Sequence, residues 1–116
     1  MKLNSTGSLS FSNGKYYSYS TKMTDNYKGY RLFNSGFYSH TTAKYQAVIR
    51  REYDYDVALD YCPYGEWDCE EVLTKELSYT QDSLELRKKQ RKTDKQKEDI
   101  IKLTNKIELI KKILEV

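Results

Sequence analysis

The residues with the clearest chemistry form a cationic run near the C-terminal end of the chain. Its members are Arg87, Lys88, Lys89, Arg91, Lys92, Lys95 and Lys97. On a helix these side chains spread around the cylinder and can meet phosphates on more than one side, in salt-sensitive contacts that do not read sequence. The alternative is a solvated helix face with i,i+4 pairs such as Lys95 with Asp99. The run therefore predicts either a nucleic-acid contact or a surface that faces only water.

A second candidate surface lies in residues 52–71, which carry eight acids and no Lys or Arg. The acidic-aromatic patch that we select there consists of Asp54, Tyr55, Asp56, Asp60, Glu66 and Trp67. Carboxylates on an aromatic-backed surface can present charge as a phosphate backbone does, and so occupy the basic nucleic-acid groove of another protein. The alternative is an acidic edge that protects an exposed strand from aggregation.

Residue types that hold metals or attack substrates are few and poorly spaced. His40 is the only histidine, and the spacing of Cys62 and Cys69 is not a recognised zinc-ligand spacing. The aspartates of residues 54–60 do not continue as a calcium loop, because the glycine and the terminal glutamate are not at the required offsets. No Gly-rich phosphate loop or nucleophile motif is present. We therefore expect a protein that is not an enzyme and has no metal site and no cofactor.

The sign of the charge changes twice along the chain. Residues 1–51 carry eight Lys/Arg against one acid, and residues 72–116 carry twelve Lys/Arg against eight acids, on either side of the acidic stretch. Such segregation can steer association with charged partners. Eleven of the twelve tyrosines precede residue 65, where they suit either a binding surface or the strands of a small sheet.

The same composition bears on where the protein works. No signal peptide is recognisable, and no segment approaches the roughly 20 apolar residues of a membrane span. We therefore expect a cytosolic protein without a membrane partner. In that reducing compartment Cys62 and Cys69 are expected to be free thiols.

Residues 1–68 are expected to form a Tyr-rich α+β head. Asn13-Gly14 lies between two alternating runs and predicts a β-hairpin in which Phe11 faces Tyr16. A third strand is expected over residues 27–33. These three strands predict a small antiparallel sheet.

A helix and a further strand complete the expected head. Ser39 or Thr41 is expected to cap a helix that ends near Glu52 and packs on the sheet. The alternation over residues 57–61 predicts a strand with one acidic face. The fold class is therefore a small α+β head followed by a C-terminal helix.

Residues 69–116 are expected to form a long charged helix, because they contain no Gly and no Pro. Asp68 can cap its first turn. Residues 78–83 are weaker helix material and predict a break, after which the helix runs to Glu115. A helical hairpin with its turn at Thr93 is the alternative, because Thr93 and Gln96 fit a capping box.

An apolar stripe marks the last third of this segment. It consists of Ile100, Leu103, Ile107, Ile110 and Leu114. The 3-4-3-4 spacing is that of a coiled-coil seam about two heptads long. It predicts a homodimer through the C-terminal helix, with packing on the chain's own head or on a foreign partner as the alternatives.

The stretch YKGYRLFNSGFYSHTTAKYQAVIRR, residues 27–51, resembles the heads of small proteins encoded by phages and mobile elements of low-GC bacteria. That group includes many anti-CRISPR proteins. The resemblance implies a non-enzymatic inhibitor that binds a host nucleic-acid-processing protein or ribonucleoprotein, such as a CRISPR effector. The alternative from the residues themselves is a small dimeric nucleic-acid-binding regulatory protein that uses the basic helix 87–97.

Overall fold

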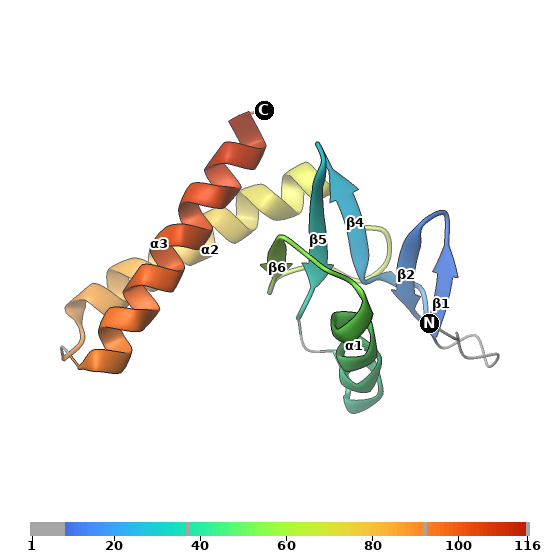
Figure 1. Ribbon diagram of the computed structural model, residues 1–116, viewed down its shortest axis with the longest axis horizontal. Coiled ribbons are helices and arrows are strands. Elements are labelled where there is room, and N and C mark those ends of the chain that lie inside the picture. The colour runs from blue at the N-terminus through green and yellow to red at the C-terminus, as the bar shows by residue number, and fades with distance from the viewer. Residues whose placement is uncertain (1–8, 37, 92, 116) are drawn as a thin grey trace.

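The structure is a computed structural model that describes residues 9–36, 38–91 and 93–115. Figure 1 shows the strands and helix α1 on one side and two long helices that project from them. The elements in chain order are β1 (Leu9–Ser12), β2 (Lys15–Ser18), β3 (Thr21–Lys22), β4 (Thr24–Tyr27), β5 (Tyr30–Asn34), α1 (His40–Glu52), β6 (Val57–Leu59), α2 (Cys69–Lys89) and α3 (Asp94–Glu115). The predicted α+β class, with a small antiparallel sheet and a C-terminal helix, is confirmed.

The N-terminal hairpin forms as predicted. Asn13 and Gly14 both take positive φ, at 53° and 78°, which suits the two central residues of a type I′ turn. The register pairs Phe11 with Tyr16, and their rings lie 4.8 Å apart between centroids. A local turn signal therefore fixes the pairing of β1 with β2.

The third strand expected over residues 27–33 is wrong, because a second hairpin occupies this part of the chain. Lys28 and Gly29 take φ of 52° and 85° and form a turn between β4 and β5. Tyr27 and Tyr30 are paired across that turn. The sequence predicted extended structure in this region, but it did not predict that the chain reverses between β4 and β5.

Two three-stranded sheets result, ordered β1-β2-β3 and β4-β5-β6. Met23 joins them, because its backbone N–H donates to Tyr16 and its carbonyl accepts from Asn34, both at 2.7 Å. β6 pairs with β5 in parallel, since α1 carries the chain back between the two strands. Ser39 caps α1 through a hydrogen bond from the Thr42 backbone N–H, which confirms the predicted helix start.

The C-terminal segment is a helical hairpin. Asp68 caps α2 by accepting the Glu71 N–H at 2.8 Å, as predicted. α2 then runs unbroken through residues 78–83, so the break expected there is wrong, as is a single helix from that point to Glu115. The chain reverses between Lys89 and Asp94 instead, which is the hairpin alternative with its turn near Thr93.

Two apolar clusters form the core. One joins Leu9, Met23, Phe33 and Ile49 and fixes α1 on the strands. The other joins both predicted parts of the chain, because Leu32 and Leu59 of the second sheet pack with Leu73 of α2 and Ile110 and Ile113 of α3. The head-proximal ends of α2 and α3 are therefore anchored in the same core as the sheet, and their far ends project away from it.

Candidate nucleic-acid interface

The end of the helical hairpin is built by specific capping contacts. The Thr93 hydroxyl accepts the Gln96 N–H at 3.1 Å, and the Thr93 carbonyl accepts the Lys97 N–H at 3.1 Å. Across the turn, the Gln96 amide donates to the Arg87 carbonyl at 2.8 Å, which satisfies a group at the end of α2. These contacts place the cationic run on two adjacent helix ends. We call residues 87–97 the hairpin tip.

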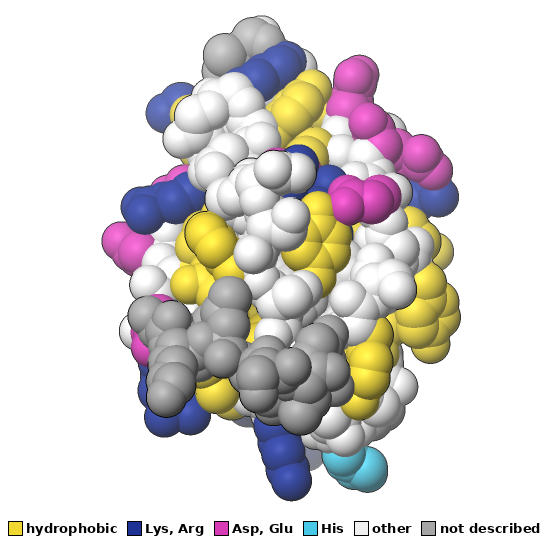
Figure 2. Space-filling view, turned by 90° about the vertical axis from the view of Figure 1, so that its right-hand side faces the viewer, with side chains coloured by type: hydrophobic (Ala, Val, Ile, Leu, Met, Phe, Trp, Pro, Cys, Tyr) yellow, Lys and Arg dark blue, Asp and Glu magenta, His cyan; other side chains and the backbone are white. Residues whose placement is uncertain are grey.

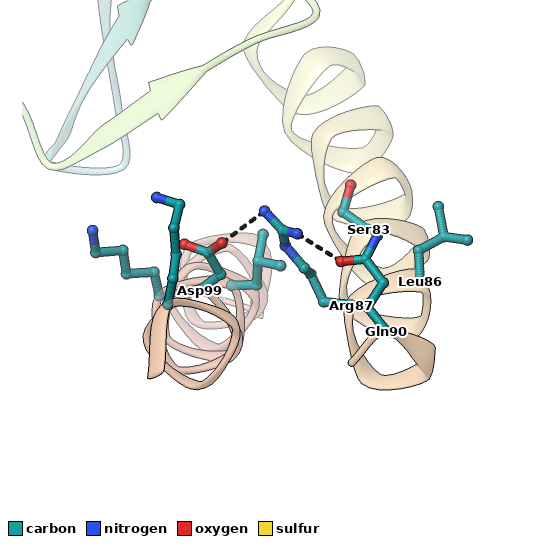
Figure 3. A pocket seen from close by; sticks show the side chains of 8 residues that line it. Ser83, Leu86, Arg87, Gln90 and Asp99 are labelled. Atoms are coloured by element: carbon teal, nitrogen blue, oxygen red, sulfur yellow. Dashed lines mark hydrogen bonds and ion pairs between the residues drawn. The ribbon is translucent and has the colours of Figure 1, made fainter. Parts of the chain in front are cut away.

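Arg87 is held inside the tip by its neighbours. Its guanidinium lies 2.7 Å from Asp99 Oδ2 on α3 and donates to the Gln90 amide oxygen at 2.6 Å (Figure 3). An Arg–carboxylate pair with these additional hydrogen bonds is oriented firmly. Arg87 therefore joins the two helices and is less available to a ligand than the cations around it.

Other cations of the tip lack such a partner. Lys89, Arg91, Lys95 and Lys97 are all exposed, and none of them forms an ion pair with any residue in the described part of the chain. Lys88 has Glu85 3.7 Å away, with both side chains exposed. Lys92 lies outside the described residues. The tip thus carries four exposed cations without an ion-pair partner among the described residues, together with one acid, Asp94.

The two helices also enclose an open pocket of about 530 Å³ beside the tip. Ser83, Leu86 and Gln90 line it from α2, while Lys95, Asp99 and Lys102 line it from α3. Figure 3 shows Asp99 and Arg87 between the helices, with Leu86 on the outer side of α2. Cationic, amide and apolar groups therefore surround one concave surface.

The face of the molecule away from the hairpin differs from the tip. Figure 2 shows its Lys and Arg side chains at separate places, most of them near the edge, and several Asp and Glu side chains together at the upper right. Hydrophobic side chains appear there as separate patches between polar atoms.

The predicted acidic-aromatic patch does not form as a continuous surface. Trp67 is only 3% exposed, and Tyr55 stacks on Phe33 with ring centroids 5.0 Å apart. Because Trp67 is buried and Tyr55 is half-buried, neither aromatic side chain of the predicted patch is exposed.

The carboxylates of the patch also bind within the chain. Asp56 accepts the Arg31 N–H at 2.7 Å, and Asp54 lies 3.5 Å from the Arg31 guanidinium. Asp60 accepts from Ser35 at 2.9 Å, and Glu66 accepts from the Tyr17 hydroxyl. That last contact, together with partial desolvation, raises the pKa of Tyr17 to about 12. These acids thus stabilise the sheet and its connections.

The predicted self-association stripe is used within the chain. Ile107 and Ile110 are buried, and Ile110 packs in the shared core. Ile100, Leu103 and Leu114 are partly buried. Because α2 and the second sheet already cover Ile107 and Ile110, the expectation that these two face a second copy is corrected to packing on the chain itself. Ile113, which a coiled-coil spacing omits, is also fully buried, since α3 contacts both α2 and β6.

A buried polar cluster beside the start of α2 was missed from the sequence. The Lys22 ammonium donates to Asp25 at 2.6 Å and to the Trp67 carbonyl at 2.7 Å, and it lies 4.2 Å from the centre of the Trp67 ring. The Cys69 thiol donates to the same Asp25 carboxylate at 3.2 Å. Lys22 and Asp25 are only three residues apart, but the fold alone shows that both are buried.

This environment shifts two pKa values in opposite directions. Burial works to raise the pKa of Asp25, but hydrogen bonds from Lys22, Cys69 and the Asn26 N–H outweigh it and hold that pKa below its ordinary value. Burial and the adjacent Asp25 carboxylate raise the pKa of Cys69 to about 12. Cys62 and Cys69 are free thiols, as predicted. The cluster is thus a structural ion pair with a protonated thiol beside it.

Two further features of the described residues bear on possible sites. None of their His, Cys, Asp and Glu side chains gather in a group of three or more that could hold a metal ion. None of their helices combines the length and the apolar character that a membrane crossing requires.

Comparison of the chain with protein-family models, with curated proteins and with solved structures gives no match.

Proposed function

We propose that this protein is a non-enzymatic nucleic-acid-binding protein whose hairpin tip contacts phosphates. The observation that carries the proposal is the set of four exposed cations, Lys89, Arg91, Lys95 and Lys97, without an ion-pair partner among the described residues. Cations held close together and unneutralised release condensed counterions when they meet a phosphate backbone. This release supplies affinity without reading sequence.

The alternative of a merely solvated helix face predicted a pair between Lys95 and Asp99. Asp99 is instead turned across the hairpin to Arg87, at 2.7 Å. That choice of partner ties the two helices together and leaves Lys95 without an acid. It therefore supports a tip that is arranged to attract anions.

The phage-type inhibitor of a nucleic-acid-handling protein stays a prediction. It drew on an exposed acidic-aromatic patch, and the burial of Trp67 together with the internal bonding of Asp56 and Asp60 weakens that argument. We therefore place direct nucleic-acid contact first. Capture of a bacterial nucleic-acid-processing protein from a lysate that has been treated with nuclease would favour the inhibitor instead.

The test compares two matched charge changes in one helix. Lys95→Gln with Lys97→Gln neutralises the tip, and Lys111→Gln with Lys112→Gln neutralises two exposed cations at the other end of α3. Fluorescence anisotropy with a labelled oligonucleotide measures binding over a series of salt concentrations. The tip variant should weaken binding and reduce the slope of log K against log salt by about 1.4 for a single strand, since two contacts are lost. The control should retain the slope.

Two results would contradict the proposal. One is the absence of binding by the unaltered protein at low salt. The other is an equal loss in the tip variant and in the control, because it would indicate attraction by overall charge without a defined site. Urea unfolding of both variants establishes that the substitutions leave the fold intact.

A further inference from the structure

The open pocket beside the tip lies between a row of side chains on α2 and a row on α3, and we call it the groove. On α2, Tyr79, Ser83, Leu86 and Gln90 recur at a 4-3-4 spacing and lie along one face. On α3, Lys95, Asp99, Lys102 and Lys106 recur at the same spacing. Three members of each row line the pocket of about 530 Å³, so both rows border it.

One side of this groove is cationic. Lys95 and Lys102 are exposed and form no ion pair with a described residue. They are two helical turns apart, or roughly 10 Å along α3. Lys106, the next member of the row, is occupied, because it lies 2.7 Å from Glu76 and 3.4 Å from Asp60. The available positive charge therefore runs from the tip to Lys102 and stops there.

The other side of the groove carries an exposed leucine among polar side chains, with an exposed tyrosine beyond it. Leu86 is 63% exposed. Tyr79, two turns closer to the head, is 46% exposed, and its ring stacks on Tyr61 with centroids 4.0 Å apart and planes at 24°. Tyr79 precedes Ser83 of the pocket by four residues, so the ring pair lies about one turn of α2 beyond the pocket, on its head side.

From this arrangement we infer that the groove binds single-stranded nucleic acid, with phosphates on Lys95 and Lys102 and bases against Leu86 and Tyr79. The inference rests on the proposed function and names the form of nucleic acid that it takes. An unpaired strand can turn its bases to an aromatic surface while its backbone follows a row of cations. A duplex keeps its bases stacked inside, so it can use only the cations. The Arg87–Asp99 pair forms the floor of the groove and holds its two sides together.

The test measures the affinity of the full chain for a labelled 12-nucleotide oligothymidine and for a 12-base-pair duplex at the same salt concentration. The variants Tyr79→Ala and Leu86→Ala remove the apolar side of the groove without changing its charge. Each should weaken binding of the single strand about 5- to 30-fold and leave binding of the duplex nearly unchanged. Tyr79→Phe keeps the ring and should retain binding.

Matched controls lie elsewhere on the surface. Tyr64→Ala removes a tyrosine that is exposed on the head, and Ile101→Ala removes an exposed apolar side chain from α3 outside the cationic row. Neither substitution should change the affinity for either oligonucleotide. Lys102→Gln should weaken single-strand binding, whereas Lys111→Gln should not.

The outcomes separate the two proposals. If the tip variant Lys95→Gln with Lys97→Gln loses binding while Tyr79→Ala and Leu86→Ala do not, the groove inference is overturned and the phosphate contact stands. The groove inference is also overturned if the unaltered protein binds the duplex and the single strand with equal affinity and if Tyr79→Ala and Leu86→Ala weaken both complexes equally. If neither oligonucleotide binds the unaltered protein, the proposed function itself is wrong.

Discussion

Both ends of the α2–α3 hairpin carry charged side chains, but the two ends differ in whether these side chains are buried and paired. At the head end, Glu76 is fully buried and accepts from the Asp60 and Tyr61 backbone N–H groups and from Lys106. At the tip, Lys89, Lys95 and Lys97 are exposed and form no ion pair with a described residue. A charge inside the protein requires partners, whereas a charge in water does not.

The two ends of the hairpin therefore have different roles. One end of the helix pair lies in the core that it shares with the sheet, and the other lies outside it. Because the anchored end determines where both helices lie, the projecting end can carry groups that contribute little to stability. Surface substitutions at the tip should therefore change binding, and substitutions at the head end should change folding.

The largest expected contrast compares two isoleucines of α3. Ile110 is fully buried in the shared core, and Ile101 is 61% exposed near the tip. Ile110→Ala should lower the free energy of unfolding by about 2–5 kcal/mol, because it removes buried methyl groups and leaves a cavity. Ile101→Ala should change it by less than about 0.5 kcal/mol. Urea unfolding measures both, and similar losses in the two variants would mean that the hairpin is not anchored at one end.

A second contrast compares two glutamates of α2. Glu76→Ala leaves Lys106 and two backbone N–H groups without their main acceptor, and should cost roughly 3 kcal/mol. Glu71→Ala removes only an exposed i,i+4 pair with Lys75, worth about 0.3–0.5 kcal/mol. The comparison fails if thermal unfolding shows the same shift for both variants.

Local signals predicted several elements of this fold correctly. Asn13-Gly14 specified a turn because both residues tolerate positive φ, and Ser39 and Asp68 specified helix starts because their side chains accept backbone N–H groups. The Lys28-Gly29 turn was missed, since a lysine with positive φ is uncommon and gives a weaker signal than asparagine.

What the sequence did not decide depends on contacts between distant residues. A capping box at Thr93 was compatible with either a continuous helix or a hairpin. Burial of Ile110 and Ile113 against Leu32 and Leu59 stabilises the hairpin. These contacts join residues that are far apart in the sequence, so no local pattern predicts them. The same holds for the candidate site. The i,i+4 spacing predicted that Asp99 pairs with Lys95 on one helix, but Asp99 pairs with Arg87 on the other helix of the hairpin.

The smallest expected effect concerns the response of stability to acid. Beside the head end of α2, Asp25 of β4 is a buried carboxylate with a lowered pKa next to a lysine, whereas Asp94, the acid of the tip, is exposed. Hydrogen bonds from Lys22 and Cys69 outweigh the desolvation of Asp25, so its pKa is lower in the folded protein than in the unfolded chain. Asp25 therefore contributes stability that is fully present above its unfolded pKa of about 4 and is lost as the pH falls through the lower folded value. Urea unfolding at pH 6 and at pH 3 should show a decrease on acidification.

The variant Asp25→Asn isolates this contribution. It should be less stable than the unaltered protein at pH 6, because Lys22 loses its buried partner, and its further decrease between pH 6 and pH 3 should be smaller. The control Asp54→Asn changes a side chain that is 91% exposed and should leave both measurements nearly unchanged. An undiminished decrease in Asp25→Asn would mean that other carboxylates cause the acid sensitivity. In that case the buried cluster would not distinguish the head end from the tip in its response to pH.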